Sequence, residues 1–213
     1  MAPLSDTTAP ITDISQLDLS QTYSYADYLS WKFSEYMELI RGRVHRKMSA
    51  LTTFHQIVSS NFNGVIWNYL KGKPGRVSPA PFDVRLLRST GNGDAQVQTV
   101  VQPDLCIICD LSKVDKRGCL GAPDWIIEIV SPSTATHDTK TKFDLYAENG
   151  VGEYWIVYPG EQAISVFVLE GDEYQPKGDY YEPGLVPCHT LPELQLQWAD
   201  VFEGKLAPTL ARA

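Results

Sequence analysis

One acidic side chain interrupts an apolar run in the middle of the chain, Trp125-Ile-Ile-Glu-Ile-Val130. The length and β-branched content of this run predict a buried strand, in which alternation places Ile126, Glu128 and Val130 on one face. A carboxylate in such surroundings costs several kcal/mol unless it is ion-paired, protonated or bound to a cation. Glu128 therefore indicates either a salt bridge to a nearby arginine or a functional site.

A second acid precedes another apolar segment. Asp104 follows Pro103 and leads into the predicted strand Leu105–Cys109. Two neighbouring strands that each contribute one carboxylate can form a hard-oxygen site. Such a site suits Mg²⁺, which takes one or two carboxylates, several waters and the phosphate oxygens of a substrate. The alternative for Asp104 is a cap at the entry of the strand.

A polar helix face follows these two strands. The segment 139–149 predicts a helix that ends at Gly150. Asp138, Lys142 and Tyr146 stand at positions i, i+4 and i+8, so they share one face of that helix. They form either part of a site or a surface Asp138–Lys142 pair with Tyr146 packed beneath it.

The remaining pattern predicts one α/β (α+β) domain, a mixed sheet flanked by a few helices. The 213 residues, 43% hydrophobic and 21% charged, suffice for one sizeable core. We expect a flexible N-terminal arm over 1–21, the domain over 22–204 and a tail over 205–213. The predicted helices cover 22–33 (N-cap Ser24), 52–70 (N-cap Thr52 or Thr53) and 198–202, and a hairpin of 35–40 with 44–48 turns at Arg41-Gly42. The predicted strands cover 77–87, which Pro79 and Pro81 break, and 97–101, 105–109, 153–157, 164–169 and 174–181. We expect a loop or hairpin turn over 89–94 and an irregular connection over 111–122.

Two cysteines have the spacing of a zinc or redox pair, but that interpretation fails. Cys106 and Cys109 lie on a predicted strand, where residues three apart point to opposite faces. No second CxxC or CxxH motif completes a zinc site. We therefore expect packed free thiols.

The charge is unevenly distributed along the chain. The formal net charge is −8, yet the segment 39–93 contains Asp83 as its one acid and is net +8. Its basic residues either form a surface that binds the phosphate backbone of DNA or scatter over several faces. They are Arg41, Arg43, Arg46, Lys47, Lys71, Lys73, Arg76, Arg85 and Arg88.

The segments described so far resemble the bacterial restriction-endonuclease domain family of the PD-(D/E)XK nuclease superfamily. The resemblance covers about residues 22–200 and implies a restriction-endonuclease-like fold with extra C-terminal strands. Its motifs are Val-Gln-Pro-Asp104, Trp-Ile-Ile-Glu128-Ile-Val-Ser-Pro, Asp138…Lys142…Tyr146, Gly-Val-Gly-Glu-Tyr-Trp-Ile-Val-Tyr-Pro159 and, upstream, Tyr36-Met-Glu-Leu-Ile-Arg-Gly-Arg-Val.

The resemblance implies roles for three residues. Asp104 is the motif aspartate and Glu128 the second acid, and both hold a divalent metal, Mg²⁺ with Mn²⁺ as a substitute. Lys142 is the motif lysine. The usual superfamily pattern places this lysine two residues after the acid, which is Val130 here, so the lysine has moved to the helix. Lys140 is the fallback.

Two further residues follow from the same resemblance. Glu38 corresponds to the N-terminal acid that sometimes joins the metal shell. His55, on the next helix, contacts either the phosphate or the edge of the site, and its alternative is a histidine packed in the core. Asp138 and Tyr146 are accessory candidates.

Two functions are compatible with these features. The first is a magnesium-dependent endodeoxyribonuclease, a hydrolase of DNA phosphodiester bonds. The second is a non-catalytic nucleic-acid-binding or interaction module on a degenerate nuclease fold. The sequence contains no P-loop, dinucleotide fingerprint or motif for base readout. With no apolar run long enough for a membrane span and no signal-peptide core, we expect a cytoplasmic protein.

The oligomeric state has two readings in the sequence. Aromatic residues are frequent in the predicted C-terminal strands, where they either form a homodimer face or pack in the core. They are Tyr154, Trp155, Tyr174, Tyr180 and Tyr181.

Overall fold

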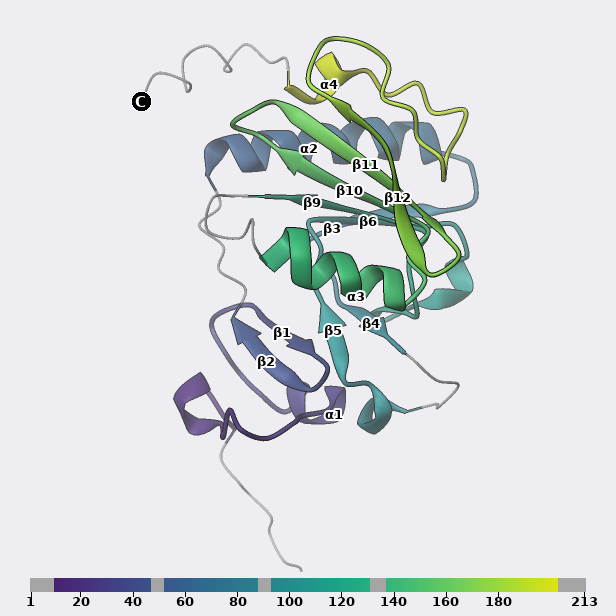
Figure 1. Cartoon of the computed structure of the whole chain (residues 1–213). Helices are drawn as coiled ribbons and strands as arrows, with labels where there is room; N and C mark the ends of the chain where they lie inside the picture. Colours follow the sequence, from purple (N-terminus) through teal and green to yellow (C-terminus); the bar gives the residue numbers. More distant parts are fainter. Residues whose placement is uncertain (1–9, 47–51, 88–92, 131–136, 203–213) are drawn as a thin grey trace, which may run out of the picture.

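A computed structural model of the chain contains two mixed sheets joined by a common core (Figure 1). It describes residues 10–46, 52–87, 93–130 and 137–202, with side chains from 140 onward in the last range. Within these residues each sheet has six strands. The predicted α+β architecture is thereby confirmed.

The first sheet carries the two apolar strands of the sequence motifs at its centre. β9 pairs with β10 in parallel, and the other neighbours pair antiparallel. The strand order is β12 (Glu173–Tyr180), β11 (Ala163–Glu170), β10 (Glu153–Tyr158), β9 (Trp125–Ile129), β6 (Leu105–Ile108) and β3 (Arg76–Pro79).

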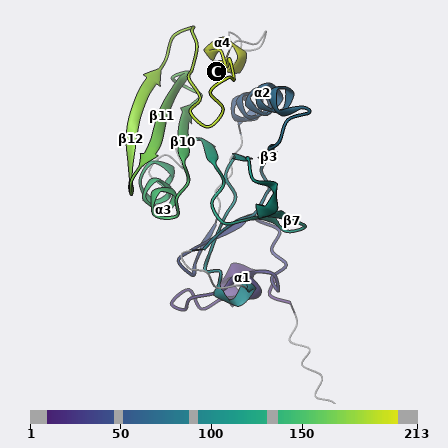
Figure 2. The same ribbon diagram turned by 90° about the vertical axis from the view of Figure 1, so that its right-hand side faces the viewer.

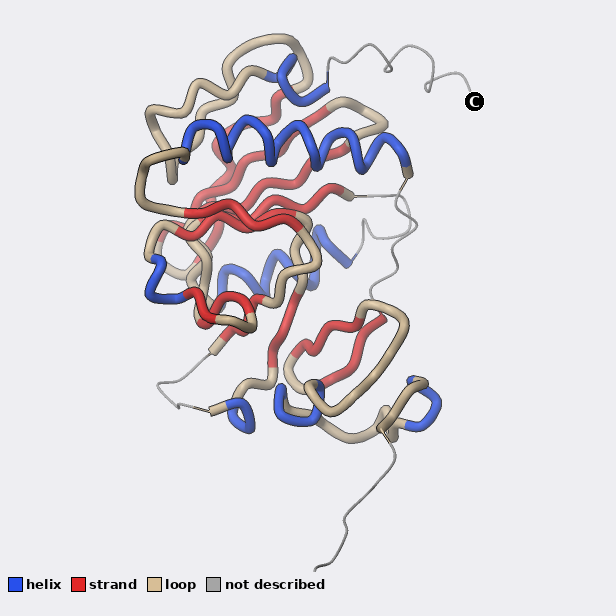
Figure 3. Tube along the Cα trace, turned by 180° about the vertical axis from the view of Figure 1, so that it is seen from behind, coloured by secondary structure: helices blue, strands red, loops and turns tan. Residues whose placement is uncertain are grey.

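Helices cover both faces of this sheet. α3 (Phe143–Glu148) crosses in front of it in Figure 1, and α2 (Thr53–Leu70) crosses in front when the molecule is seen from behind (Figure 3). The alternation along β9 matches these two layers. Trp125 and Ile127 pack in the core that contains α2, whereas Ile126 packs with α3. Glu128 therefore lies on the α3 side, as the alternation predicted.

The second sheet lies below the first, with α1 (Tyr25–Tyr28) beside it (Figure 2). One apolar cluster includes Ile40, Val84 and Val101 from this sheet together with Ile108 and Ile126 from the first. Both sheets thus share a core. The strand order is β2 (Arg43–Arg46), β1 (Met37–Ile40), β5 (Thr99–Val101), β4 (Val84–Leu86), β8 (Gly118–Leu120) and β7 (Val114–Asp115).

Local signals account for the hairpin and for α2. Arg41 and Gly42 have φ values of 51° and 77°, and such a turn joins β1 to β2 in the predicted place. A Cβ at Gly42 would lie 2.9 Å from the Thr22 Cβ, so glycine is needed there. The Thr52 hydroxyl accepts from the backbone N–H of His55 and caps α2, as predicted.

The helix predicted over 139–149 has an irregular start. A π-helical turn, η4 (His137–Lys142), runs directly into α3. α3 ends at Glu148 with Asn149 as its C-cap, and Gly150 follows with a φ of 80°, in agreement with the predicted stop. α4 (Trp198–Phe202) matches its predicted bounds.

Three predictions about the chain are corrected. The first helix is confined to Tyr25–Tyr28, although Ser24 is its N-cap. The segment 111–122 contains the β7–β8 hairpin, because Cys119 pairs with Val84, which is distant in the sequence. Residues 10–21 are not a loose arm, because Leu17 is buried in an apolar cluster that also contains Tyr25 of α1 and Leu39 of β1. Residues 1–9, 47–48, 89–92 and 205–213 of the expected arm, hairpin, loop and tail lie outside the described residues.

Core packing explains most of the C-terminal aromatic residues. Tyr154, Trp155 and Tyr174 are buried, whereas Tyr181 is 65% exposed. The first three therefore cannot form a dimer face. Cys106 and Cys109 pack against different core clusters as free thiols, which confirms that they face opposite sides. Among the described helices, none combines the length and apolarity that crossing a bilayer requires.

Candidate active site

Five elements bring ionisable side chains to one end of the first sheet. β9 ends there and β6 begins there because the two strands are antiparallel, and the start of α2, the start of α3 and β1 meet them. The side chains at this position are nearly all removed from solvent, with relative exposures of 1% for Glu38, 8% for His55, 7% for Asp104, 1% for Glu128 and 2% for Lys142.

Lys142 lies between two of the acids. Its Nζ is 2.9 Å from Glu128 Oε1 and 3.1 Å from Glu38 Oε1. A buried ammonium between two carboxylates offsets part of the cost of burying each charge. Lys142 is thus placed within the group of acids, and it is not the exposed partner of a surface pair.

Tyr146, one turn after Lys142, reaches the same carboxylate. Its hydroxyl donates to Glu128 Oε1 at 2.7 Å, so the predicted i, i+4 relationship directs both side chains to one atom. Burial, followed by the charges of Glu128 and Glu38, raises the pKa of Tyr146 well above its usual value of 10. The phenol therefore remains a neutral donor at physiological pH.

Asp104 is fixed by contacts on the neighbouring strand and on α2. Its Oδ2 accepts from the backbone N–H of Ile129 at 2.8 Å and lies 3.3 Å from His55 Nε2. The Asp104 carboxylate thereby joins β6 to the end of β9, the strand that carries Glu128. The Nδ1 of His55 is buried and has no hydrogen-bond partner among the described residues. His55 thus contacts Asp104 through Nε2 from the start of α2.

Gln102 is a member of this group that the sequence analysis did not assign. Its backbone N–H donates to Glu38 Oε1 at 2.9 Å, and its side-chain amide donates to Asp83 at 2.9 Å and to the Tyr28 hydroxyl at 3.3 Å. The signal available in the sequence was its position two residues before Asp104. Gln102 positions Glu38 and links the site to the second sheet.

Lys140 and Val130 do not reach the group. Lys140 is exposed, although it is only two residues from Lys142. Val130, the position of the usual motif lysine, packs in an apolar cluster. The side chain of Asp138 lies outside what the structure describes.

The donor chemistry of the site suits a magnesium ion. Asp104 and Glu128 supply the hard carboxylate oxygens that Mg²⁺ takes together with waters and phosphate. No three His, Cys, Asp or Glu side chains among the described residues gather closely enough to hold an ion alone. Glu38 as a third ligand therefore does not follow from the geometry.

The basic residues of segment 39–93 do not form one continuous surface among the described residues. Arg85 is 2% exposed, because strand β4 directs it inward, where it meets Asp115 at 2.7 Å. Arg41 lies 2.7 Å from Glu148 on the surface. Three exposed bases remain together at the junction of α2 and β3, namely Lys71, Lys73 and Arg76. Lys47 and Arg88 lie outside the described residues.

An acid on each of two adjacent strands, with a lysine beside them in a mixed α+β fold, is the arrangement of a restriction-endonuclease-like protein. The sequence matches the Uma2 family, described as "Putative restriction endonuclease", over residues 25–199. The match covers most of the chain, so the protein belongs to this family, and the resemblance seen in its motifs is confirmed.

Two individual proteins are also similar to this chain. The fold is similar to the crystal structure of "a putative nuclease belonging to DUF820" from Anabaena variabilis, with a TM-score of 0.62 and 23% identity, over 84% of this chain and 97% of that one. An uncharacterized protein from Synechocystis is 24% identical over 125 residues. That match spans 58% of this chain and 61% of the Synechocystis protein.

Proposed function

We propose that the protein is a magnesium-dependent endonuclease that hydrolyses phosphodiester bonds of DNA. The observation that supports this most strongly is the position of Lys142, whose ammonium lies 2.9 Å from Glu128 although it comes from a different element. With Asp104 on the adjacent strand, the site has both acids and the basic group of the superfamily pattern. Family membership supports the same reaction class.

Each side chain has a separate task in this proposal. Asp104 and Glu128 would hold the divalent ion, which lowers the pKa of a bound water and neutralises charge on a phosphate oxygen. Lys142 supplies positive charge where negative charge develops on the phosphoryl group and orients the attacking water. These roles require fixed carboxylates, because misplaced ligands cost rate.

The surrounding donors provide that fixation. The Ile129 N–H holds Asp104, the Tyr146 hydroxyl holds Glu128 and the Gln102 N–H holds Glu38. All three are neutral donors, so they orient the acids without competing for the charge of the ion. His55 supports Asp104 from the start of α2.

A second candidate is a non-catalytic nucleic-acid-binding module. One observation favours it: the Lys142 ammonium already lies between Glu38 and Glu128, as in a structural ion triad. In that case the group would stabilise the core and no metal would be required. DNA would then bind without being cut.

Cleavage of supercoiled plasmid DNA separates the two candidates. The wild-type protein should nick or linearise the plasmid with Mg²⁺ or Mn²⁺ and should be inactive in EDTA. Asp104→Ala, Glu128→Ala and Lys142→Ala should abolish cutting, whereas Lys140→Ala, the matched exposed lysine, should cut normally. Wild-type cutting that both acid variants retain would refute the site assignment. DNA retention without any metal-dependent cutting would favour the binding module.

A further inference from the structure

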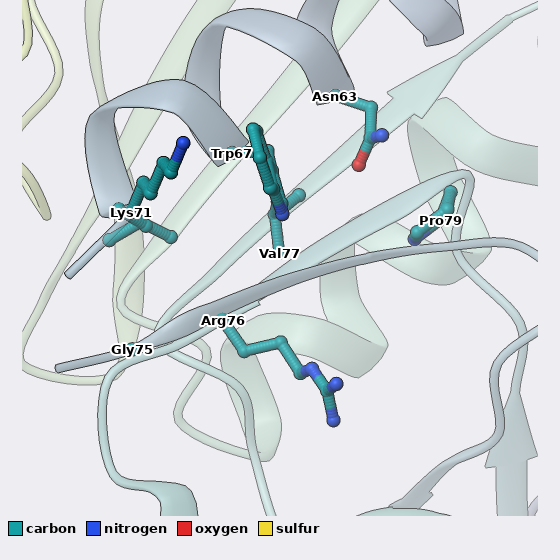
Figure 4. Close-up of a pocket in the computed structure, with 8 residues that line it drawn as sticks. Asn63, Trp67, Lys71, Gly75, Arg76, Val77 and Pro79 are labelled. Carbon is teal, nitrogen blue, oxygen red and sulfur yellow. The ribbon is translucent and has the colours of Figure 1, made fainter. Parts of the chain in front are cut away.

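A groove separate from the acidic group runs between α2 and β3, which is the edge strand of the first sheet. It has a volume of about 360 Å³. Figure 4 shows Asn63 and Trp67 on successive turns of α2 and Lys71 at its C-cap, with Arg76 extending from the start of β3. Asn63 and Trp67 are four residues apart, so they share one face of α2, and Lys71 follows directly after the helix. The groove is thus formed by adjacent segments of the chain.

An exposed tryptophan is the most unusual feature of this groove. Trp67 is 55% exposed, whereas Trp31, Trp125, Trp155 and Trp198 are buried. Its indole stands over the groove beside Val77 (Figure 4). A large aromatic ring exposed in a concave site offers a stacking surface to a ligand.

The charge of the groove complements an anion. Lys71 and Arg76 line it, and no acidic side chain does. No described carboxylate lies within ion-pair distance of either base. Lys71 Nζ lies 5.5 Å from the centre of the Trp67 ring, so positive charge and stacking surface are side by side. Lys73, at the same junction, adds a third cation, 3.4 Å from the centre of the Tyr69 ring.

We propose that this groove binds an unpaired segment of single-stranded DNA, with a base stacked on Trp67 and the flanking phosphates held by Lys71 and Arg76. Aromatic stacking surfaces combined with basic side chains are how proteins bind single strands without sequence preference. The bases of an intact duplex are stacked on one another, so they cannot reach the indole. Asn63, with an amide donor and acceptor, can contact the edge of the base.

The position of the groove relates it to the proposed nuclease site. Pro79 at one end of β3 pairs with Leu105, the residue after Asp104. Trp67 lies twelve residues along α2 from His55, about 18 Å along the helix axis. The groove would therefore hold nucleotides that flank the bond to be cut. The inference rests on the proposed function for its substrate class and specifies unpaired DNA near the cleavage position.

Binding of an oligothymidylate of about 20 nucleotides tests the groove without any need for cleavage. In EDTA, the single strand should quench the fluorescence of Trp67, the exposed tryptophan, and should protect it from iodide. A matched blunt duplex should do neither. Absence of single-strand binding, or binding that leaves the fluorescence unchanged, would overturn the inference.

Variants extend this test. Trp67→Ala should weaken single-strand binding about tenfold and Trp67→Phe much less, whereas duplex binding should stay within about twofold. Lys71→Ala should reduce the salt dependence of binding by about one ion. Tyr181→Ala, an exposed aromatic residue outside the groove, is the matched control and should bind like wild type. Unchanged affinity of Trp67→Ala for the single strand would contradict the proposal.

The two proposals fail separately. Trp67-dependent binding by a protein that never cuts DNA would reject the nuclease and retain the groove. Metal-dependent plasmid cutting together with normal single-strand binding by Trp67→Ala would reject the groove and retain the nuclease.

Discussion

The Nζ of Lys142 lies 2.9 Å from Glu128 Oε1, and both side chains are almost completely buried. The lysine comes from the turn that begins α3, and the acid comes from the centre of the first sheet. This contact connects the stability of the core with the chemistry that we propose for the site. Substitutions that separate the two effects are therefore informative.

Removal of the ammonium should destabilise the fold. Lys142→Met leaves Glu38 and Glu128 buried without their shared counter-charge, and we expect a loss of about 3–5 kcal/mol in the free energy of unfolding. Urea denaturation followed by far-UV circular dichroism measures it. Lys140→Met, on the exposed neighbour, should stay within about 0.5 kcal/mol of wild type. Equal urea midpoints for the two variants would contradict the burial of Lys142.

Loss of the Tyr146 hydroxyl should lower both the stability of the protein and its rate of DNA cleavage. Tyr146→Phe keeps the ring in the core and removes one donor to Glu128, at a cost of about 1.5–3 kcal/mol of stability. DNA cleavage should also fall, because Glu128 is less firmly oriented. Tyr181→Phe, on an exposed ring, should change neither property. Wild-type cleavage and stability of Tyr146→Phe together would show that the hydroxyl is dispensable.

Glu153 provides a comparison between a structural acid and a proposed catalytic one. It is as buried as Glu128, but it accepts from Trp155 Nε1 at 2.7 Å and from the backbone N–H groups of His189 and Thr190 at 3.1 and 2.6 Å. Glu153→Gln should lower stability by about 1–3 kcal/mol and leave the cleavage rate of the folded protein unchanged.

The same substitution at Glu128 should affect DNA cleavage, which Glu153→Gln leaves unchanged. Glu128→Gln should abolish metal-dependent cutting even where the protein remains folded at the assay temperature. Equal cleavage rates of the two glutamine variants would contradict the assignment of Glu128.

Stability should decrease at alkaline pH. Burial raises the pKa of the Cys119 thiol from 9.0 to about 11. Below pH 9 the thiol is protonated in both states, and its contribution is complete. Above pH 9 the unfolded thiol ionises first, so up to about 2 kcal/mol should be lost as the pH approaches 11. Urea unfolding at several pH values measures this slope.

Cys119→Ala should make the alkaline loss smaller. Buried tyrosines whose pKa is raised, such as Tyr174, act in the same direction from pH 10 upward, so part of the decrease should persist in the variant. An identical pH dependence of the variant and the wild type would contradict the contribution of the thiol.

Elements with strong local signals were predictable from the sequence. Thr52 caps α2, Arg41-Gly42 turns the first hairpin and Gly150 stops α3, and each of these residues fixes the backbone through its own conformation or cap. The alternation along β9 likewise predicted which face Glu128 occupies. The sequence motifs also grouped Asp104, Glu128 and Lys142, although their catalytic roles stay predictions.

Features that depend on distant contacts were not predictable. β7 and β8 are two and three residues long, and they exist because β8 pairs with β4 across a long stretch of sequence. The π-helical turn at the start of α3 was not predictable either, because an i, i+4 pattern does not distinguish a π-helical turn from an α-helical one. Arg85 points inward, so the exposed positive charge of segment 39–93 is smaller than its net charge of +8. The sequence gives that net charge but not which of the basic side chains are exposed.

Anomalous scattering from crystals of the wild-type protein soaked in Mn²⁺ tests directly whether Asp104 and Glu128 bind a divalent metal. We predict a peak between the carboxylates of Asp104 and Glu128 that is lost in Asp104→Ala crystals soaked in the same way. A well-ordered, manganese-saturated crystal with no peak at this position would contradict the assignment of Asp104 and Glu128 as metal ligands.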